Sequence, residues 1–317
     1  MRKEMQRMIT VAGLTPSIDR YIHLERLSVG GTNRPLLCQD RPGGKGFHVA
    51  RMLKRLGCDV HLITPAYRTG MAPMLEMLER SGLDYTAVPA PGELRVNTKL
   101  LDRSASMITE INMPAVLGDS SVQEACAAAI DSQAEKSDWL VLTGSLPHDV
   151  PAGFYAERIR HARCAAPKCR ILLDTAGEAL RLAIPEKPDM IKPNRHELEL
   201  LTGRSLPTAQ DIAHEALRLN RQGIRTVLVS MDADGSLLVT ENRCLSACAI
   251  HVDVETTVGA GDSLVAGYLS ASVENPRDCE TALRTGIACA SAHVAGCDDA
   301  YRSFLDRVEI RPVAYLP

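Results

Sequence analysis

Residues 256–263 read Thr-Thr-Val-Gly-Ala-Gly-Asp-Ser, and apolar residues at helical spacing follow them directly. Gly259 and Gly261 flank a small residue, so the backbone can turn tightly and expose successive N–H groups. Such a loop at a helix N-terminus favours an anion, because unpaired N–H groups and the helix dipole both attract negative charge. Asp262 in this turn is placed to take a proton from a hydroxyl while the loop holds a phosphoryl group. The alternative is a structural loop in which Asp262 only caps the helix.

The composition excludes some classes of function. The chain has 317 residues, 45% of them hydrophobic, which is enough for one large α/β domain or two small ones. Aromatic residues make up only 3%, which argues against a stacking surface for single-stranded nucleic acid. The 36 basic and 39 acidic residues give a net charge of −3 without a concentrated basic tract, so no nucleic-acid partner is expected.

The cysteines and the N-terminus indicate a compartment. The 10 cysteines are scattered and form no Cys-x-x-Cys pair, and no histidine cluster completes a zinc site near them. This pattern is typical of reduced thiols in the cytosol. The charged residues 1–8 precede only a short apolar run, which is too short for a signal peptide or a membrane span. We expect a soluble cytoplasmic protein with no membrane partner.

Short apolar runs alternate with helical patterns through most of the chain, which predicts an α/β fold with a mostly parallel sheet and helices on both faces. The expected strands are Ile9–Leu14, Val60–Thr64, Trp139–Thr143, Arg170–Asp174, Met190–Lys192 and Thr226–Ser230. The expected helices are Gly46–Leu56, Met71–Ser81, Ser120–Lys136, Ala152–Ala162, His196–Leu201, Ala209–Asn220, Ser263–Ser272 and Cys279–Ala295.

Residues 17–42 and 93–112 break this alternation. They contain short strand patterns at Tyr21–Leu24, Asn33–Cys38, Asn97–Leu101 and Met107–Ile111. We expect these strands to form a small β-sheet that emerges from the main sheet as a lid over a site. The whole of 1–317 is then a single domain with this lid. Because ligands bind beyond the carboxyl ends of parallel strands, the motifs that follow predicted strands become the candidates for a site.

Two further motifs suit phosphate chemistry. Pro42-Gly43-Gly44-Lys45-Gly46 opens a helix and lets a polar ligand approach the backbone, with Lys45 as a point charge for phosphate; a structural loop is the alternative. Residues 192–197, Lys-Pro-Asn-Arg-His-Glu, follow a strand. Asn194 and Glu197 have the spacing of a capping box, and they also suit a site near a metal-bound phosphate, since Mg²⁺ accepts a carboxylate through its retained waters.

Other candidates lie at strand ends and in the lid. Ser145 and residues 230–236 follow predicted strands and are equally compatible with ordinary turns. Asp19, after the first strand, is a plausible acceptor for sugar hydroxyls. Arg34 and Arg95 lie in the expected lid, where each could meet a substrate phosphate or be a solvated edge charge.

These motifs, in this order, resemble the ribokinase-like sugar kinases of the phosphofructokinase-B family, over residues 9 to about 296. The pair PGGKG…VARMLKRLG and TTVGAGDS is specific to that family, and KPNRHE lies between them. TPSID after the first strand, GGTNR in the lid and Thr109–Pro114 are most similar to the phosphosugar branch, which includes 1-phosphofructokinases, tagatose-6-phosphate kinases and 6-phosphofructokinases.

The resemblance implies ATP-dependent phosphoryl transfer with Mg²⁺, most simply from ATP to fructose 1-phosphate, and a homodimer that pairs through the lid. Matched residue by residue, it implies a base, an anion hole, metal and nucleotide ligands and a sugar site. The residues are Asp262 as base; Gly259, Ala260 and Gly261 as anion hole; Asn194 and Glu197 (through water) for the metal; Lys192, Asn194, Ser230, Gly235 and Thr257 for the nucleotide; Asp19, Gly43, Gly44, Lys45 and His48 for the sugar; and Arg34, Arg95 and Ser145 for its phosphate.

Departures from the family pattern leave alternatives open. His48 stands where the family usually has Asn, Ala115 where it has Gly, and Gly296-Cys297 where it has Gly-Thr. The substrate could then be tagatose 6-phosphate, fructose 6-phosphate, or an unphosphorylated sugar or nucleoside. A sugar-phosphate sensor without turnover is a third hypothesis, because fold alone does not determine function.

Overall fold

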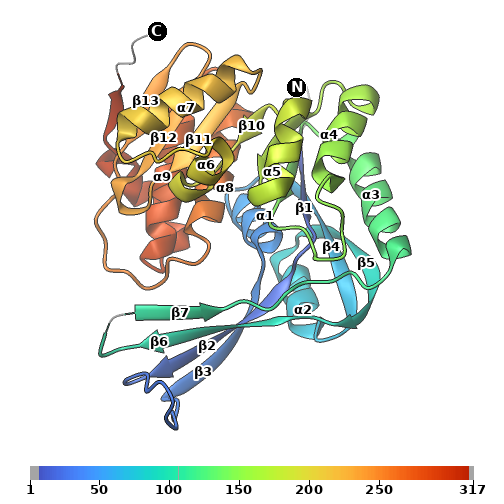
Figure 1. The fold of residues 1–317 in the computed structure, drawn as a ribbon, viewed down its shortest axis with the longest axis vertical. Coiled ribbons are helices and arrows are strands. Elements are labelled where there is room, and N and C mark those ends of the chain that lie inside the picture. Colours follow the sequence, from blue (N-terminus) through green and yellow to red (C-terminus); the bar gives the residue numbers. More distant parts are fainter. Residues whose placement is uncertain (1–6, 106, 314–317) are drawn as a thin grey trace, which may run out of the picture.

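The fold is built on one large twisted sheet, seen in a computed structural model that describes residues 7–105 and 107–313 (Figure 1). The sheet is ten-stranded, and its strands lie in the order β14-β13-β12-β11-β10-β9-β8-β1-β4-β5. From β5 to β11 the neighbours are parallel, while β12, β13 and β14 form an antiparallel edge. The bounds are β1 Met8–Gly13, β4 Asp59–Thr69, β5 Asp84–Glu93, β8 Trp139–Thr143, β9 Arg170–Asp174, β10 Met190–Ile191, β11 Thr226–Ser230, β12 Ser236–Thr240, β13 Cys244–Ala247 and β14 Ile310–Pro312.

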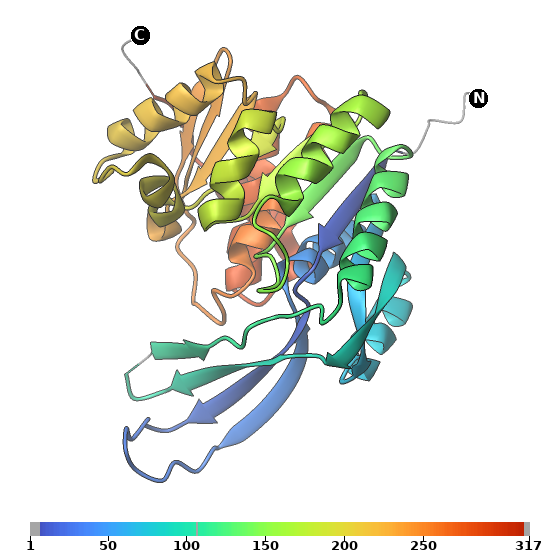
Figure 2. The same cartoon turned by 45° about the vertical axis from the view of Figure 1, so that its right-hand side comes forward.

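Helices cover both faces of this sheet, which confirms the predicted α/β class. In Figure 2 the helices α3, α4, α5 and α7 lie in front of the sheet, and α1, α8 and α9 lie behind it. The helix bounds are α1 Lys45–Arg55, α2 Ala72–Ser81, α3 Ser120–Ala134, α4 Phe154–Ala165, α5 Gly177–Ala183, α6 Arg195–Thr202, α7 Ala209–Arg221, α8 Ala260–Glu274 and α9 Cys279–Val294; short 3₁₀ turns are η1 Ile184–Glu186, η2 Asp232–Asp234 and η3 Asp298–Arg307.

A second, four-stranded sheet projects from the main body (Figure 1), as the sequence predicted. Its strands, in spatial order, are β3 Leu37–Gly43, β2 Ser17–Leu24, β6 Val96–Asp102 and β7 Met107–Ile111. The strand expected at Asn33–Cys38 was misplaced. The side chain of Asn33 instead closes a turn, accepting from Ser28 N at 2.8 Å and donating to Ser28 O at 2.9 Å. The strand that follows this turn is polar and exposed, so no apolar alternation marks it.

Among the elements of the main sheet's layers, the helix α5 and the strands β5, β12, β13 and β14 were not predicted. The strand β5 contains Pro89 and Pro91, which read as breakers in a sequence. They are tolerated because β5 is the edge strand and pairs only with β4. The helix α5 has only seven residues, too few to show a helical period.

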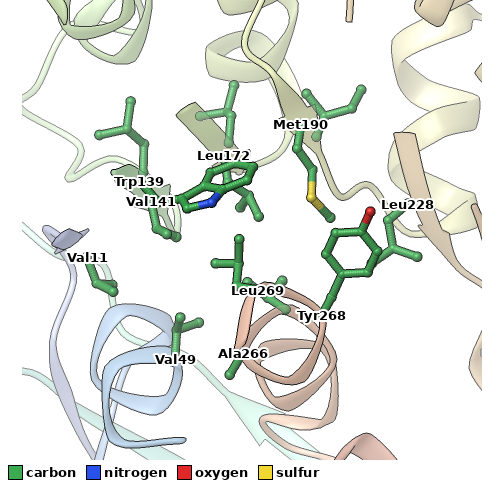
Figure 3. Packing of buried hydrophobic residues seen from close by; sticks show 14 of the residues in the cluster. Val11, Val49, Trp139, Val141, Leu172, Met190, Leu228, Ala266, Tyr268 and Leu269 are labelled. Carbon is green, nitrogen blue, oxygen red and sulfur yellow. The ribbon is translucent and has the colours of Figure 1, made fainter. Parts of the chain in front are cut away.

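The helix that starts at the glycine loop packs into the centre of the core. Figure 3 shows Ala266, Tyr268 and Leu269 of α8 facing strand residues that include Val141 and Met190. These residues are at most 5% exposed. Because helices cover both faces of these parallel strands, side chains on both faces are buried, and the strands are continuous apolar runs in the sequence.

The helices α8 and α9 touch backbone to backbone. A Cβ atom on Gly267 would lie 2.7 Å from the Thr285 carbonyl oxygen, and one on Gly286 would lie 2.9 Å from the Leu264 carbonyl oxygen. A side chain at either position would push the helices apart. The close approach holds the end of α9 against the loop that begins α8.

No helix in the described part of the chain combines the length and the apolar character that crossing a membrane requires. Residues 1–6, which carry most of the charged N-terminus discussed above, lie outside the described residues.

Candidate active site

A cavity of about 800 Å³ opens where the carboxyl ends of the parallel strands meet the small sheet. Its lining draws on β2 and β6 of the small sheet, on the residues after β8, β10 and β11, on segment 249–258 and on the first turn of α8. This is the edge at which open α/β sheets bind ligands. The cavity therefore brings together motifs that lie up to about 240 residues apart in the chain.

The glycine loop forms the floor of this cavity beside α8. Gly259 has φ 90°, a left-handed conformation that suits glycine, and it precedes the first helical residue, Ala260. The first-turn N–H groups of a helix have no intrahelical acceptor, and Gly259, Ala260 and Gly261 all line the cavity. The Ala260 N–H donates at 3.3 Å to the carbonyl oxygen of Thr257, outside the helix. The loop thus has the geometry of an anion site.

Asp262 lies in the same turn and is only 5% exposed. Burial raises the pKa of Asp262 to about 6, with Lys45 opposing the rise and Asp174 adding to it. A carboxylate with a pKa near neutrality is suited to accept a proton from a hydroxyl and to release it again.

Asp174, at the end of β9, is the main site residue that the sequence analysis missed. Its fully buried carboxylate lies 3.2 Å from Lys45 Nζ and 3.3 Å from Lys192 Nζ, and Thr143 Oγ1 donates to it at 3.3 Å. Burial opposes ionisation, but Lys192 and Lys45 together hold the pKa of Asp174 below its usual range. Burial likewise acts to lower the pKa of Lys45, and Asp174 and Asp262 outweigh it and raise that pKa. The ion pairs with Asp174 therefore fix both lysine side chains at the cavity wall.

At the end of the cavity that faces the small sheet, Asp19 is held rigidly. Its Oδ1 accepts from Ser17 Oγ at 2.9 Å and from Asn97 Nδ2 at 2.9 Å, and the residue is 4% exposed. A Cβ atom on Gly43 would lie 2.5 Å from Oδ2 of Asp19. Gly43 does not line the cavity itself; it leaves room for the Asp19 carboxylate.

His48 faces the same region, and both of its ring nitrogens are buried without a hydrogen-bond partner in the described structure. Burial, with the nearby Arg51 charge, lowers the pKa of His48 to about 4. The ring is neutral near pH 7 and has one donor and one acceptor nitrogen to offer a ligand.

The two predicted phosphate-binding arginines differ in position. Arg95 lines the cavity and donates to the carbonyl oxygens of Pro16, Met113 and Thr15 at 3.2, 2.8 and 2.9 Å. Since a guanidinium has five N–H bonds, two remain for a ligand. Arg34 is exposed in the segment between β2 and β3 and is not among the lining residues.

The small sheet also contributes a polar group that was not predicted. Lys99 is 3% exposed, and its Nζ lies 2.6 Å from Glu110 Oε2 and 3.0 Å from Asn112 Oδ1. Glu110 and Asn112 line the cavity. Glu110 and Asn112 lie in the stretch Thr109–Pro114 that carried the family resemblance, but no site role was predicted for them or for Lys99, because the contact forms only when β6 and β7 pair.

Asn194 and Glu197 form a capping box at the start of α6. Asn194 Oδ1 accepts from Glu197 N at 2.7 Å, and Glu197 Oε2 accepts from Asn194 N at 2.8 Å. Both residues line the cavity. The capping box does not use the second carboxylate oxygen of Glu197. The geometry therefore allows the motif to cap the helix and also to lie near a metal-bound phosphate.

The remaining predicted residues also reach the cavity: Gly44, Ser145, Ser230, Gly235 and Thr257. Gly235 has φ 91°, and a Cβ atom there would lie 2.0 Å from the Ala247 carbonyl oxygen, so the turn between β11 and β12 requires glycine. Segment 249–254, which carries no recognisable motif, adds a mostly apolar wall opposite Ser230.

Comparisons with known proteins agree with this geometry. The model of the pfkB family of carbohydrate kinases matches residues 6–299. The chain is 34% identical to the 1-phosphofructokinase of Bacillus subtilis (strain 168) over 292 residues, which is 90% of this chain and 92% of that protein. It is 32% identical to the 1-phosphofructokinase of Rhodobacter capsulatus over 269 residues, 84% of each.

Among solved structures, the fold is similar to Escherichia coli phosphofructokinase-2 in complex with fructose-6-phosphate. The TM-score is 0.83 with 26% identity, over 96% of this chain and 99% of that one. Match length, identity and fold point the same way: this chain belongs to the pfkB family of carbohydrate kinases.

Proposed function

We propose that this kinase transfers the terminal phosphoryl group of ATP to a hydroxyl of fructose 1-phosphate, giving fructose 1,6-bisphosphate and ADP. One observation carries the proposal. The buried Asp262 at the N-terminus of α8 shares a single cavity with fixed cationic groups, Lys45 and Arg95. A base, an anion site and positive charge for a phosphorylated acceptor are the groups that this reaction needs. The names of the similar proteins favour the same acceptor.

At the acceptor end, we assign the sugar hydroxyls to Asp19 and His48, with the backbone of Gly44 close by. Asp19 accepts and a neutral His48 both donates and accepts, so together they suit a polyol. The acceptor's phosphate group is assigned to Arg95, Lys45 and Ser145. Arg34 does not reach the cavity of its own chain and has no part in this assignment.

At the donor end, the nucleotide phosphates are assigned to Lys192 and Asn194, and the base to the apolar segment 249–254. Ser230, Gly235 and Thr257 border this end of the cavity. Cavities for nucleotides are mostly apolar with a few placed polar groups, which matches this lining.

Magnesium fits this site only as part of the nucleotide complex. Within residues 7–105 and 107–313 no cluster of three or more His, Cys, Asp or Glu side chains is arranged to hold a metal ion. Mg²⁺ retains several waters and binds through one or two carboxylates plus substrate phosphates, and Glu197 has a free carboxylate oxygen at the cavity for a water-mediated contact. The ion would neutralise charge on the nucleotide phosphates.

The chemical step then follows from the positions of the side chains. The carboxylate of Asp262 accepts the proton of the acceptor hydroxyl, whose oxygen forms a bond to the terminal phosphorus as the bond to ADP breaks. The N–H groups of Gly259, Ala260 and Gly261 stabilise the charge on the transferring group. Lys45, fixed by Asp174, adds a positive charge that does not have to reorganise during transfer.

The quaternary structure and compartment are part of the same proposal. Exposed apolar side chains lie on the small sheet and the turn beside it: Leu36, Leu37, Met107 and Ile111 are 46–62% exposed. A patch of this kind on a projecting sheet favours pairing with a second copy of the chain. We propose a cytoplasmic homodimer through the small sheet, and light scattering of the purified protein, with Met107→Glu as the disrupting variant, tests it.

The test of function is ADP release with ATP and Mg²⁺ against fructose 1-phosphate, fructose 6-phosphate, tagatose 6-phosphate, fructose, ribose and adenosine. Saturable turnover with the highest kcat/KM on fructose 1-phosphate supports the proposal. A preference for a 6-phosphate would keep the reaction and change the acceptor, while turnover only on a neutral acceptor would overturn the roles of Lys45 and Arg95. Ligand-induced stabilisation without turnover would favour a sensor.

A further inference from the structure

His293, near the end of α9, lies behind the glycine loop and outside the cavity lining. Its Nδ1 is 2.8 Å from Asp298 Oδ1, and its Nε2 is 2.8 Å from the Val258 carbonyl oxygen. A carbonyl oxygen and a carboxylate oxygen only accept hydrogen bonds, so both ring nitrogens donate. The ring is therefore an imidazolium.

The peptide bond that His293 holds is the one that carries the Gly259 N–H group. No cis peptide bond occurs in the described residues, and in a trans peptide the C=O and N–H bonds point in opposite directions. With the Val258 carbonyl directed at His293, the Gly259 N–H is directed away from His293; Gly259 lines the cavity, and His293 is not among the lining residues. A charged donor on the carbonyl also polarises the peptide and strengthens the N–H as a donor.

Three further observations fix the ring in this position. A Cβ atom on Gly259 would lie 3.0 Å from His293 Nε2, so the left-handed glycine and the ring fit closely together. Asp298 is itself anchored, because its Oδ2 accepts from Arg55 NH1 at 2.5 Å. The contact between Gly267 and α9 described above holds the helix that carries the ring.

We propose that His293 is a positioning residue for phosphoryl transfer: its imidazolium, held by Asp298, orients and polarises the Val258–Gly259 peptide so that the Gly259 N–H serves the anion site. This inference rests on the proposed kinase function and adds a residue that does not touch substrate.

The charged environment of the ring defines the expected pH behaviour. The groups around it are Asp298 from η3, Arg51 and His48 from α1, and Asp262 from α8. Burial acts to lower the pKa of His293, but the hydrogen bonds with Asp298 and Val258 outweigh it and raise that pKa above its usual value. This direction agrees with a ring that donates from both nitrogens, and the imidazolium is lost as the pH rises through the raised pKa.

The first test is turnover of His293→Ala. Removing an anion-site donor outright costs about 10²–10³-fold in kcat, and misdirecting one should cost about tenfold or more. For His293→Ala we expect kcat to fall about tenfold or more and the KM of the acceptor to stay within about twofold. Added imidazole should restore part of kcat. His214→Ala, on the exposed face of α7, is the matched control. A purely structural role would give a different result: His293→Ala would melt at a lower temperature and lose affinity for both substrates, with no specific loss of kcat. Failure of imidazole to restore kcat would also show a purely structural role.

Asp298→Asn keeps a hydrogen-bonding side chain beside Nδ1 but removes the charge that holds the proton. The alkaline limb of the kcat profile should move to lower pH, whereas Asp278→Asn, the cap at the other end of α9, should leave it in place. If the alkaline limb of the kcat profile stays at the same pH in Asp298→Asn, the proposal is overturned.

A nitrogen-15 NMR spectrum of the histidine rings separates this inference from the kinase function itself. Both nitrogens of His293 should show the protonated shift at pH 7.5 in the wild-type protein, whatever the acceptor. A neutral ring overturns the inference even if turnover on fructose 1-phosphate is established. Absence of turnover with a doubly protonated ring would instead count against the function.

Discussion

The carboxylate of Asp174 lies between two lysines, 3.2 Å from Lys45 Nζ and 3.3 Å from Lys192 Nζ. The lysines come from different parts of the chain, one at the start of α1 and one just after β10. In the proposed reaction one serves the acceptor and the other the nucleotide. Asp174 thus links the two halves of the site and keeps their charges a fixed distance apart.

Replacing Asp174 by Asn should destabilise the protein, because it leaves the buried Lys192 ammonium without a counter-ion. Breaking a buried ion pair by removing one partner typically costs about 3–5 kcal/mol, and the remaining amide acceptor and the partial exposure of Lys45 should reduce this to about 2–4 kcal/mol. Urea denaturation measures the free energy of unfolding. Asp119→Asn, an exposed helix cap, is the control and should leave the free energy of unfolding nearly unchanged, because Asn caps a helix about as well as Asp does. Equal losses in the two variants would contradict this account.

Asp262→Asn should lower kcat by about 10²–10⁴-fold, the usual range for loss of a general base, with little change in ATP affinity. Steady-state kinetics and a nucleotide-binding titration check the two parts separately. Near-wild-type turnover would remove Asp262 from the role of base.

The pH profile should report the same residue. Since burial raises the pKa of Asp262 to about 6, the carboxylate is protonated below that pH and cannot accept the hydroxyl proton. We expect wild-type kcat/KM for fructose 1-phosphate to fall tenfold per pH unit on the acid side of about pH 6. The residual activity of Asp262→Asn should lack this limb, and a limb retained in the variant would assign it to another group.

The parts of the site that the sequence predicted are those encoded by local motifs. Asp262 with its glycine loop and Lys45 each lie at the start of a helix, the Asn194/Glu197 pair follows β10 within a few residues, and all line one cavity. Their positions follow from the rule that the carboxyl ends of parallel strands share an edge.

The parts that were missed depend on contacts between distant segments. Asp174 ends a strand that was predicted correctly, but its role appears only when β9 lies beside β8 and β10. Arg95 was predicted as a phosphate ligand and does line the cavity, but the sequence did not show that three backbone carbonyls from segments 15–16 and 113 occupy three of its five N–H donors. The edge strand β5 was hidden by its prolines, and the polar β3 has no alternation to reveal it.

Gly43→Ala should weaken binding of the acceptor but spare the nucleotide. The φ of Gly43 is not positive, so alanine is allowed by the backbone, but its Cβ would lie 2.5 Å from the Asp19 carboxylate. Ser17 and Asn97 hold that carboxylate, so it would have to break these hydrogen bonds to move away. We expect the KM of the sugar phosphate to rise about tenfold or more and the KM of ATP to stay within about twofold. Gly153→Ala, where the added Cβ has no atom within 4 Å, is the control; parallel changes in both KM values would contradict a local effect.

His48→Asn should change how stability depends on pH. In the folded protein the pKa of His48 is lowered to about 4 by burial and by Arg51, whereas the ordinary value is 6.5. Between these values the unfolded chain binds a proton that the folded protein refuses, so His48 progressively destabilises the fold as the pH falls from about 6.5 toward 4. Asn does not titrate, and the Tm of the variant relative to wild type should therefore rise between pH 7.5 and pH 5.

The control for this experiment is His196→Asn, at an exposed position on α6. Its Tm difference from wild type should be the same at both pH values, because the His196 side chain is exposed. His293, whose raised pKa changes stability in the opposite direction, is present in wild type and in both variants. Its charge contributes to the lowered pKa of His48, so that contribution is part of the His48→Asn difference. A Tm difference for His48→Asn that stays constant with pH would mean that the ring takes up its proton in the folded state without penalty, and His48 could then meet the acceptor as a cation rather than as a neutral donor and acceptor.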